Sequence, residues 1–166
     1  MSDDEGASNN ELLLAACRED NLGLLDEVLS SEPDSFSINH TDGLGNSALH
    51  YAAKYASTDC LEILLYFDGI DINIKNRLEW ETPLHKAVAY EDPETALTMT
   101  RLLVEAGAST TALNKQKQTP ADKAPSDTHG EVKEYLETVR IGSNYDARDI
   151  PADDDDDSDG VASDED

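Results

Sequence analysis

Apolar residues recur along this chain with the three- and four-residue spacing of helices that are buried on one side. Leu61, Leu64 and Leu65 fall on one helical face, and Glu62 falls on the opposite face. Comparable apolar positions recur in three further segments, namely Leu22, Leu25 and Val28-Leu29, then Leu102 and Leu103, and then Val132, Leu136 and Val139. A short helix pair cannot bury its apolar stripe alone, so the pattern predicts stacked neighbouring pairs in an all-α fold.

A four-residue pattern repeats along the middle of the chain. Residues 47–50 read Ser-Ala-Leu-His, residues 82–85 read Thr-Pro-Leu-His 35 positions later, and residues 119–122 read Thr-Pro-Ala-Asp after 37 more. A leading Ser or Thr can cap a helix, and a following proline fits the first helical turn, where no N–H is needed. Gly69 and Gly107 follow the apolar helices of two copies, as glycines that end helices do. Each copy therefore predicts a pair of helices.

These residues resemble the ankyrin repeat, whose signature is Thr-Pro-Leu-His-x-Ala-Ala, a second helix ending in Leu-Leu, and then Gly-Ala. The stretch at 82–87 is an intact copy of the first part. The resemblance implies an ankyrin-repeat solenoid of about four helix-turn-helix units with β-turn fingers, spanning residues 11–140. The expected units are 11–40, 41–76, 77–114 and 115–140, between disordered acidic termini at 1–10 and 141–166.

The resemblance also assigns structural roles to the repeat motif. It implies that the imidazoles of the Leu-His positions hydrogen-bond neighbouring backbone. The structural motif residues are His50, Thr82, Pro83, His85, Gly69 and Gly107.

Three departures from the family pattern affect the expected fold. The third unit spaces its helices three residues wider than the second, and Pro93 predicts a longer loop between them. Trp80 occupies the position before Thr82 where the family has a finger glycine. Pro125 weakens the first helix of the fourth unit, which we expect to be partly irregular.

Charge narrows the classes of partner. The chain has 37 acidic and 12 basic residues and a formal net charge of −25, and 11 of the acids follow residue 145. Repulsion from phosphates argues against nucleic acid or an anionic membrane as a direct ligand. The acidic N-terminus lacks the features of a signal peptide, and no apolar run reaches the ~20 residues of a membrane helix. We expect a cytoplasmic monomer, with a nuclear location also compatible.

Candidate catalytic residues are few. His40 and His129 fall in predicted loops, where we expect solvent exposure, and the serines have no nucleophile-elbow context. Cys17 and Cys60 sit in helical apolar patterns and are expected to be buried, reduced thiols, without the spacing of a zinc site. We therefore predict no enzyme activity, no cofactor and no metal.

A candidate partner-binding surface follows from the ankyrin register. Finger tips and the exposed side of each first helix line a concave face in such stacks. Aromatic anchors beside acids suit a partner with aliphatic and basic side chains. An alternative is that Trp80 packs on the next finger while Tyr55 and Tyr90 belong to the core between repeats. The candidate partner-binding residues are Leu44, Asn46, Lys54, Tyr55, Glu79, Trp80, Glu81 and Tyr90.

These observations predict a non-enzymatic protein–protein interaction module that binds a partner through the concave face. One alternative is a chaperone or escort of a highly basic client such as a ribosomal protein, assisted by the acidic tail around Asp153–Asp157. The other is a regulatory subunit of an enzyme. The tail can equally be only solubilising. Ser2 and Ser163 are each followed by three acids and match substrates of acidophilic kinases.

Overall fold

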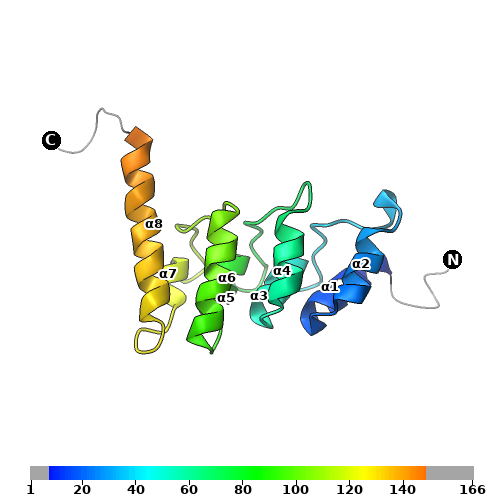
Figure 1. Cartoon of the computed structure of the whole chain (residues 1–166), viewed down its shortest axis with the longest axis horizontal. Helices are drawn as coiled ribbons and strands as arrows, with labels where there is room; N and C mark the ends of the chain where they lie inside the picture. The colour runs from blue at the N-terminus through cyan, green and yellow to red at the C-terminus, as the bar shows by residue number, and fades with distance from the viewer. Residues whose placement is uncertain (1–7, 149–166) are drawn as a thin grey trace. The chain divides into compact units, whose positions relative to one another are not determined.

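The computed structural model describes residues 8–148 of the chain, and within them it contains eight α-helices and one 3₁₀ helix but no extended strand (Figure 1). The elements in chain order are α1 (Asn9–Glu19), α2 (Leu22–Leu29), η2 (Pro33–Ser35), α3 (Ala48–Lys54), α4 (Thr58–Leu65), α5 (Pro83–Val88), α6 (Pro93–Glu105), α7 (Pro120–Lys123) and α8 (Gly130–Arg148). The predicted all-α class is confirmed. No helix in this range has the length and apolar character needed to cross a bilayer.

The same capping device starts the first helix of each repeat. In each case a hydroxyl accepts a hydrogen bond from the third backbone N–H of the helix, and the third side chain accepts one from the backbone of the cap. This reciprocal pair satisfies two N–H groups that a helix start leaves unpaired. The pairs are Ser8 with Glu11, Ser47 with His50, Thr82 with His85, and Thr119 with Asp122.

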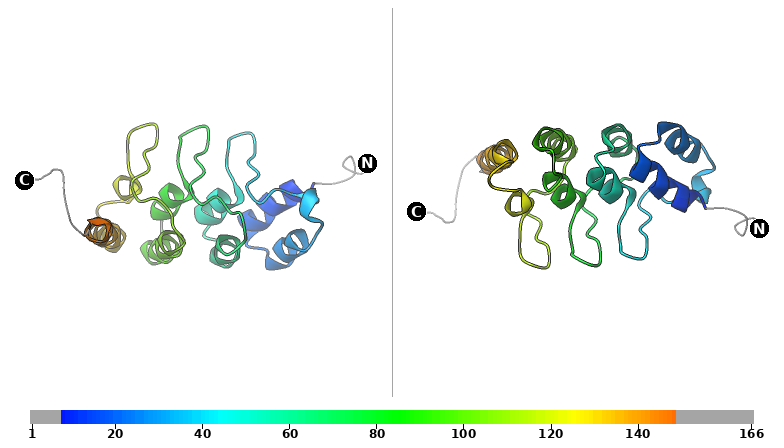
Figure 2. Two further views of the ribbon diagram at one scale, coloured as in Figure 1. Left: turned by 90° about the horizontal axis from the view of Figure 1, so that it is seen from above. Right: turned by 90° about the horizontal axis from the view of Figure 1, so that it is seen from below.

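Helices of the same kind pack side by side within residues 8–132. The first helices α1, α3, α5 and α7 contact one another in sequence, and the second helices α2, α4 and α6 do the same (Figures 1 and 2). Leu13, Leu49 and Leu84 from the first layer and Leu61 and Leu103 from the second are fully buried. Each such side chain contributes about 1.5–3 kcal/mol when buried. Stacking thus buries the stripes that the sequence pattern displayed.

The third repeat differs from the expectation of a longer loop at Pro93. Pro93 is the first residue of α6, and the extra residues lengthen that helix to 13 residues, against eight in α4. The loop before α6 has four residues, against three before α4, so it is longer by only one residue. The rest of the insertion is helical because proline fits a first helical turn and Asp92 caps the helix there, accepting a hydrogen bond from the Thr95 N–H at 3.0 Å.

The fourth repeat is short at its start and long at its end. Helix α7 has four residues and ends before Pro125, while α8 begins at Gly130 and runs to Arg148. Helix α8 therefore continues eight residues past the expected domain end at residue 140, and Pro151 is the next proline in the sequence.

At the N-terminal end of the chain, α1 begins at Asn9, inside the segment expected to be disordered. Residues 1–7 and 149–166, with Ser2, Ser163 and the acidic run, lie outside the described residues.

Three long loops project on the same side of the helix layers (Figure 2). We call them the fingers: the first covers residues 41–46, the second 75–81 and the third 113–118. Each is closed by a backbone hydrogen bond, from Asp42 N to Asn46 O at 3.1 Å in the first, Asn76 N to Glu81 O at 3.0 Å in the second, and Asn114 N to Gln118 O at 3.1 Å in the third. We call the fingers together with α3, α5 and α7 the finger face.

Candidate protein-binding surface

Adjacent fingers are joined through their backbones. The N–H of Arg77 donates to the carbonyl of Leu44 at 2.9 Å, and the N–H of Lys115 donates to the carbonyl of Glu79 at 2.9 Å. Gly45 permits the first of these contacts, because a Cβ at this position would lie 2.5 Å from the Arg77 nitrogen, and its φ is +83°. The fingers therefore form one continuous edge.

Two buried histidines, one in each of the second and third repeats, hydrogen-bond to the backbone of the finger that follows their repeat. Nδ1 of His50 accepts a hydrogen bond from the Ser47 N–H at 3.0 Å, so its Nε2 must carry the proton that is donated to the Glu81 carbonyl at 2.8 Å. His85 repeats this arrangement with Thr82 N at 3.1 Å and the Gln118 carbonyl at 3.0 Å. Burial lowers the pKa of His50 from 6.5 to about 4 and lowers that of His85 as well. The fold thus uses both imidazoles in their neutral form.

Gly69 and Gly107 occupy the left-handed turns expected after the second helices. Gly69 has a φ of +85° and Gly107 a φ of +112°. Both glycines are exposed, and a Cβ at either position would meet no atom within 4 Å. The requirement for glycine at these two positions is therefore one of backbone conformation.

Glu81 lies inside the stack and not on the surface where the sequence placed it. It is 3% exposed, and its carboxylate lies 3.4 Å from Lys86 Nζ and 3.2 Å from Lys123 Nζ. Asn114 Nδ2 donates to the same carboxylate at 3.1 Å. The periodicity of the sequence did not reveal this burial, since the ion-pair and hydrogen-bond partners of Glu81 come from three later segments: α5, the third finger and α7. Glu81 therefore connects the third and fourth repeats.

Glu79 is also held by neighbours. Lys86 Nζ lies 2.7 Å from its Oε1, and Asn76 Nδ2 donates to the same oxygen at 3.3 Å. The hydrogen bond from Lys86 lowers the pKa of the Glu79 carboxyl. The two acids that were expected to attract a basic partner thus already have cationic partners within the chain.

The side chain of Trp80 is exposed, and its backbone has a conformation that is unfavourable for a non-glycine residue. Its φ is +60°, the left-handed region that costs a non-glycine residue about 1–2 kcal/mol. The residue is 52% exposed, and Lys115 Nζ of the next finger lies 5.7 Å from the ring centroid. One contact of the packing alternative is therefore present, while half of the residue still faces solvent.

The other candidates divide between the two ends of the first helices. Leu44 is exposed on the first finger, and Asn46 is half-buried, with its Oδ1 accepting from Asn76 Nδ2 at 3.0 Å. Tyr55 and Tyr90 follow the C-terminal ends of α3 and α5, whereas the fingers precede the N-terminal ends of these helices. The two ends of a seven-residue helix are about 10 Å apart. The apolar and aromatic candidates Leu44, Tyr55, Trp80 and Tyr90 therefore do not form one cluster, because the length of the helices separates them.

Tyr55 is half-exposed and belongs to a small aromatic stack. Its ring lies 6.3 Å from that of Tyr51 at an interplanar angle of 9°, with Lys54 Nζ 5.5 Å from its centroid. Tyr51 itself is buried and donates its hydroxyl hydrogen to Asp42. Tyr90 is half-buried, and its carbonyl accepts from His129. Lys54 and Tyr55 thus form a second exposed group at the C-terminal end of α3.

The binding residues chosen from the sequence did not include the cations of the fingers. Lys75, Arg77, Lys115 and Lys117 are all exposed on the second and third fingers. A signal was present in the sequence: both fingers place basic residues beside the repeated asparagine, as Lys75-Asn76-Arg77 and Asn114-Lys115. The high acidity of the whole chain concealed this local excess of bases.

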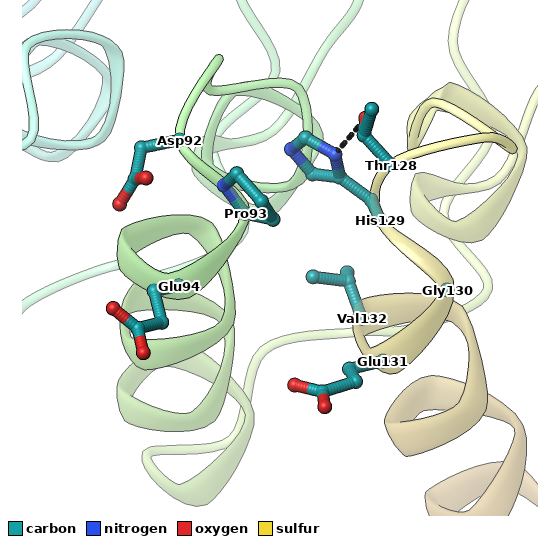
Figure 3. A pocket seen from close by; sticks show the side chains of 8 residues that line it. All are labelled: Asp92, Pro93, Glu94, Thr128, His129, Gly130, Glu131 and Val132. Carbon is teal, nitrogen blue, oxygen red and sulfur yellow. Dashed lines mark hydrogen bonds between the residues drawn. The ribbon is translucent and has the colours of Figure 1, made fainter.

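A cavity of about 450 Å³ lies where α6 and α8 begin (Figure 3). Asp92, Glu94 and Glu131 on its wall each occupy the first turn of a helix or its cap, where a carboxylate stabilises the helix. The expectation that His129 is exposed was wrong. His129 is buried, and its ring nitrogens lie 2.7 Å from Thr128 Oγ1 and 2.6 Å from the Tyr90 carbonyl. Both ring nitrogens of this imidazole are therefore engaged by neighbouring groups.

The two cysteines meet in the core although they are 43 positions apart. Cys17 of α1 and Cys60 of α4 are buried and free. A hydrogen bond with Cys60, together with burial, raises the pKa of the Cys17 thiol well above its usual range. Across residues 8–148, no group of three or more histidine, cysteine or carboxylate side chains is arranged to hold a metal.

Comparison with known proteins agrees with this architecture. The family model for ankyrin repeats in many copies matches residues 13–65 and 49–100. The ankyrin repeat-containing protein YGL242C of Saccharomyces cerevisiae is 38% identical over 82% of this chain and 81% of its own length. The chain belongs to the ankyrin-repeat family. Ankyrin repeats generally serve as protein–protein interaction modules, and the family is generally non-enzymatic.

Two larger proteins are similar to this ankyrin-repeat chain over one region. A transient receptor potential cation channel subfamily A member 1 homologue of Caenorhabditis elegans is 36% identical over 52% of this chain and 7% of its own length. The human BCL-6 corepressor-like protein 1 is 37% identical over 69% of this chain and 6% of its own length. The matched region is thus a small part of each of these much longer chains.

Proposed function

We propose that this ankyrin-repeat protein binds another protein through its finger face, with Trp80 as the main anchor. The observation that carries the proposal is the combination of exposure and strain at Trp80. A glycine at this position would adopt the φ of +60° without a steric cost, as Gly45 does at the equivalent position of the first finger. Lys117 has a φ of +63° at the equivalent position of the third finger, so the turn itself imposes this conformation. What distinguishes Trp80 is a large, half-exposed ring held there at a cost in stability, which a binding role explains.

The surroundings of Trp80 suit an anchor. Leu44 and Leu78 are exposed large apolar residues on the same two joined fingers. Tryptophan is enriched among the residues that dominate binding energies, particularly within a ring of other contacts that exclude water. The backbone bonds between fingers hold this edge in place before a partner arrives, which lowers the entropic cost of binding.

The test is capture of partners by the tagged full-length chain, followed by mass spectrometry. Two variants are compared: Trp80→Ala on the finger face, and Tyr66→Ala at the end of α4, where Tyr66 is 81% exposed. We expect Trp80→Ala to weaken the affinity for a captured partner by about 2 kcal/mol or more. Tyr66→Ala is expected to leave it unchanged. Equal capture by both variants would refute the proposal.

A second candidate function, escort of a highly basic client, is supported by the net charge of −25. Its proposed effector, the acidic run Asp153–Asp157, lies outside the described residues. Glu79 and Glu81 already pair with lysines, so this role would depend on acids elsewhere in the chain. If it holds, capture enriches basic proteins that are lost when salt rises from 0.1 to 0.5 M, since screening weakens such contacts. A captured set without an excess of basic proteins would count against it.

A further inference from the structure

The finger face has the opposite charge to the rest of the molecule. It contains seven of the 12 basic residues of the chain and only four of the 37 acidic ones, so its formal net charge is +3. The remainder of the chain carries −28. The Debye length at physiological ionic strength is about 8 Å, so a ligand touching the fingers is influenced mainly by the nearest charges.

The acids of this face are already neutralised or bonded. Glu81 and Glu79 have the lysine partners described above. Asp42 accepts hydrogen bonds from the Tyr51 hydroxyl and from the N–H groups of Leu44 and Asn46. Asp122 accepts from the Thr119 N–H at 3.0 Å as part of the α7 cap. These carboxylates are therefore engaged within the fold.

Exposed cations of the second and third fingers have neutral neighbours instead. Arg77 Nη1 lies 3.5 Å from the Gly43 carbonyl, and Lys75 Nζ lies 2.8 Å from the Leu113 carbonyl. Lys115 lies over the Trp80 ring. Among residues 8–148, the ion pairs found do not include Lys75, Arg77, Lys115 or Lys117. These side chains retain charge that a carboxylate from outside can pair with.

The repeat geometry fixes the spacing of two of these cations. Arg77 and Lys115 each follow the asparagine that starts the turn, so they occupy equivalent positions on neighbouring fingers. Helices of neighbouring repeats pack about 10 Å apart. A chain extended in the polyproline II conformation rises about 3.1 Å per residue with three residues per turn, so side chains three positions apart share one face and lie about 9 Å from each other. Trp80 and Leu78 belong to the second finger, which also carries Arg77.

We propose that the finger face binds an extended acidic segment of a partner protein, in which two carboxylates three residues apart flank an apolar side chain. Arg77 and Lys115 pair with the two carboxylates, and the apolar side chain packs on Trp80. Lys75 and Lys117 add attraction for neighbouring acids. This inference rests on the proposed function, and it gives the partner the opposite charge to the basic client of the escort hypothesis.

Trp80 is the one tryptophan of the chain, so its fluorescence reports on this face directly. The full-length protein is titrated at 0.15 M salt with three synthetic peptides of equal length that share a central leucine. The first carries aspartates three residues apart around the leucine, the second has lysines in their place, and the third has the aspartates adjacent to each other. We expect the first to bind at least tenfold more tightly than the second and several-fold more tightly than the third.

Charge reversal tests the residues named. The double change Arg77→Glu and Lys115→Glu is expected to weaken binding of the first peptide at least tenfold and to improve binding of the lysine peptide. The matched control, Arg101→Glu with Arg140→Glu, removes two exposed bases outside the finger face and is expected to change binding less than twofold. Melting temperatures of both variants establish that they fold.

The outcomes separate this inference from the proposed function. Preference of the unmodified protein for the lysine peptide, or indifference to the Arg77 and Lys115 reversal, overturns the acidic-segment proposal. If a captured partner is nevertheless lost with Trp80→Ala, the finger face still binds protein and only its charge preference was wrong. If Trp80→Ala leaves capture intact, the proposed function itself fails.

Discussion

His50 donates a hydrogen bond from Nε2 to the carbonyl oxygen of Glu81, 31 residues further along the chain, at a distance of 2.8 Å. The same backbone segment carries the buried Glu81 carboxylate, which pairs with Lys86 and Lys123. The backbone of Glu81 therefore accepts a hydrogen bond from the histidine of the preceding repeat, and its side chain pairs with one lysine of its own repeat and one of the next. This arrangement positions Trp80, which directly precedes Glu81.

Stability is expected to fall as the pH drops from 6.5 toward 4, because His50 is held neutral in the fold. Its pKa is 6.5 when unfolded and about 4 when folded, so the unfolded chain binds the proton first in this interval. The stabilisation is complete above pH 6.5 and is lost as the pH falls toward 4. Linkage gives a loss of about 2 kcal/mol between pH 7.5 and 5 from this residue. Urea denaturation at these two pH values measures it.

The variant His50→Gln isolates this contribution. It is expected to be less stable than the unmodified chain at pH 7.5, since the paired imidazole is lost, but to lose about 2 kcal/mol less on going to pH 5. An identical pH dependence in both proteins would show that His50 is not the titrating group.

Glu81→Gln is expected to destabilise the fold much more than Glu79→Gln. Removing the Glu81 charge takes the buried carboxylate from Lys123 and leaves Lys86 with Glu79 as its ion-pair partner, and it costs about 2 kcal/mol. Glu79 has a side chain that is 45% exposed, and the loss of its ion pair costs about 0.5 kcal/mol. Chemical denaturation at pH 7 compares the two. Equal costs would contradict the interior role assigned to Glu81.

Gly45→Ala is expected to be among the most damaging changes in the fingers. It combines the cost of a φ of +83° with a Cβ placed 2.5 Å from the Arg77 nitrogen, and should destabilise by about 2 kcal/mol or more. Gly43→Ala is the control, because a Cβ there meets no atom within 4 Å. Thermal unfolding should separate the two, and a harmless Gly45→Ala would mean that the fingers are not held in the described contact.

Trp80→Gly is expected to be more stable than Trp80→Ala by about 1 kcal/mol, although glycine usually lowers stability. The reason is the φ of +60°, which glycine adopts freely and alanine does not. Both variants remove the ring, so both should lose partner binding. Greater stability of the alanine variant would argue against the strained backbone on which the binding proposal rests.

The repeat architecture could be predicted because its signals are local. Ser47 and Thr82 indicate where helices start, and the stripes of leucine indicate which helix faces are buried. Pro93 misled because proline marks both loops and first helical turns, and the choice depended on the cap provided by Asp92. His129 misled because its bond to Tyr90 spans 39 positions.

The binding surface was harder to predict because charge pairing depends on distant segments. Glu79 and Glu81 are close to Trp80 in sequence and looked like one acidic group. Only the fold shows that Lys86 and Lys123 reach Glu81 and withdraw it from the surface. The net charge of −25 likewise says nothing about a local excess of bases such as Arg77 and Lys115. Proximity in space, which sequence periodicity does not encode, decides both cases.

Site-specific photo-cross-linking tests most directly whether the finger face is the protein-binding surface. A photoreactive amino acid replaces Leu78, which is 62% exposed on the second finger, or Ile63, which is exposed on α4. With a partner captured by the unmodified chain, we expect a covalent adduct from position 78 and little or none from position 63. An adduct from position 63 with none from position 78 would contradict the account.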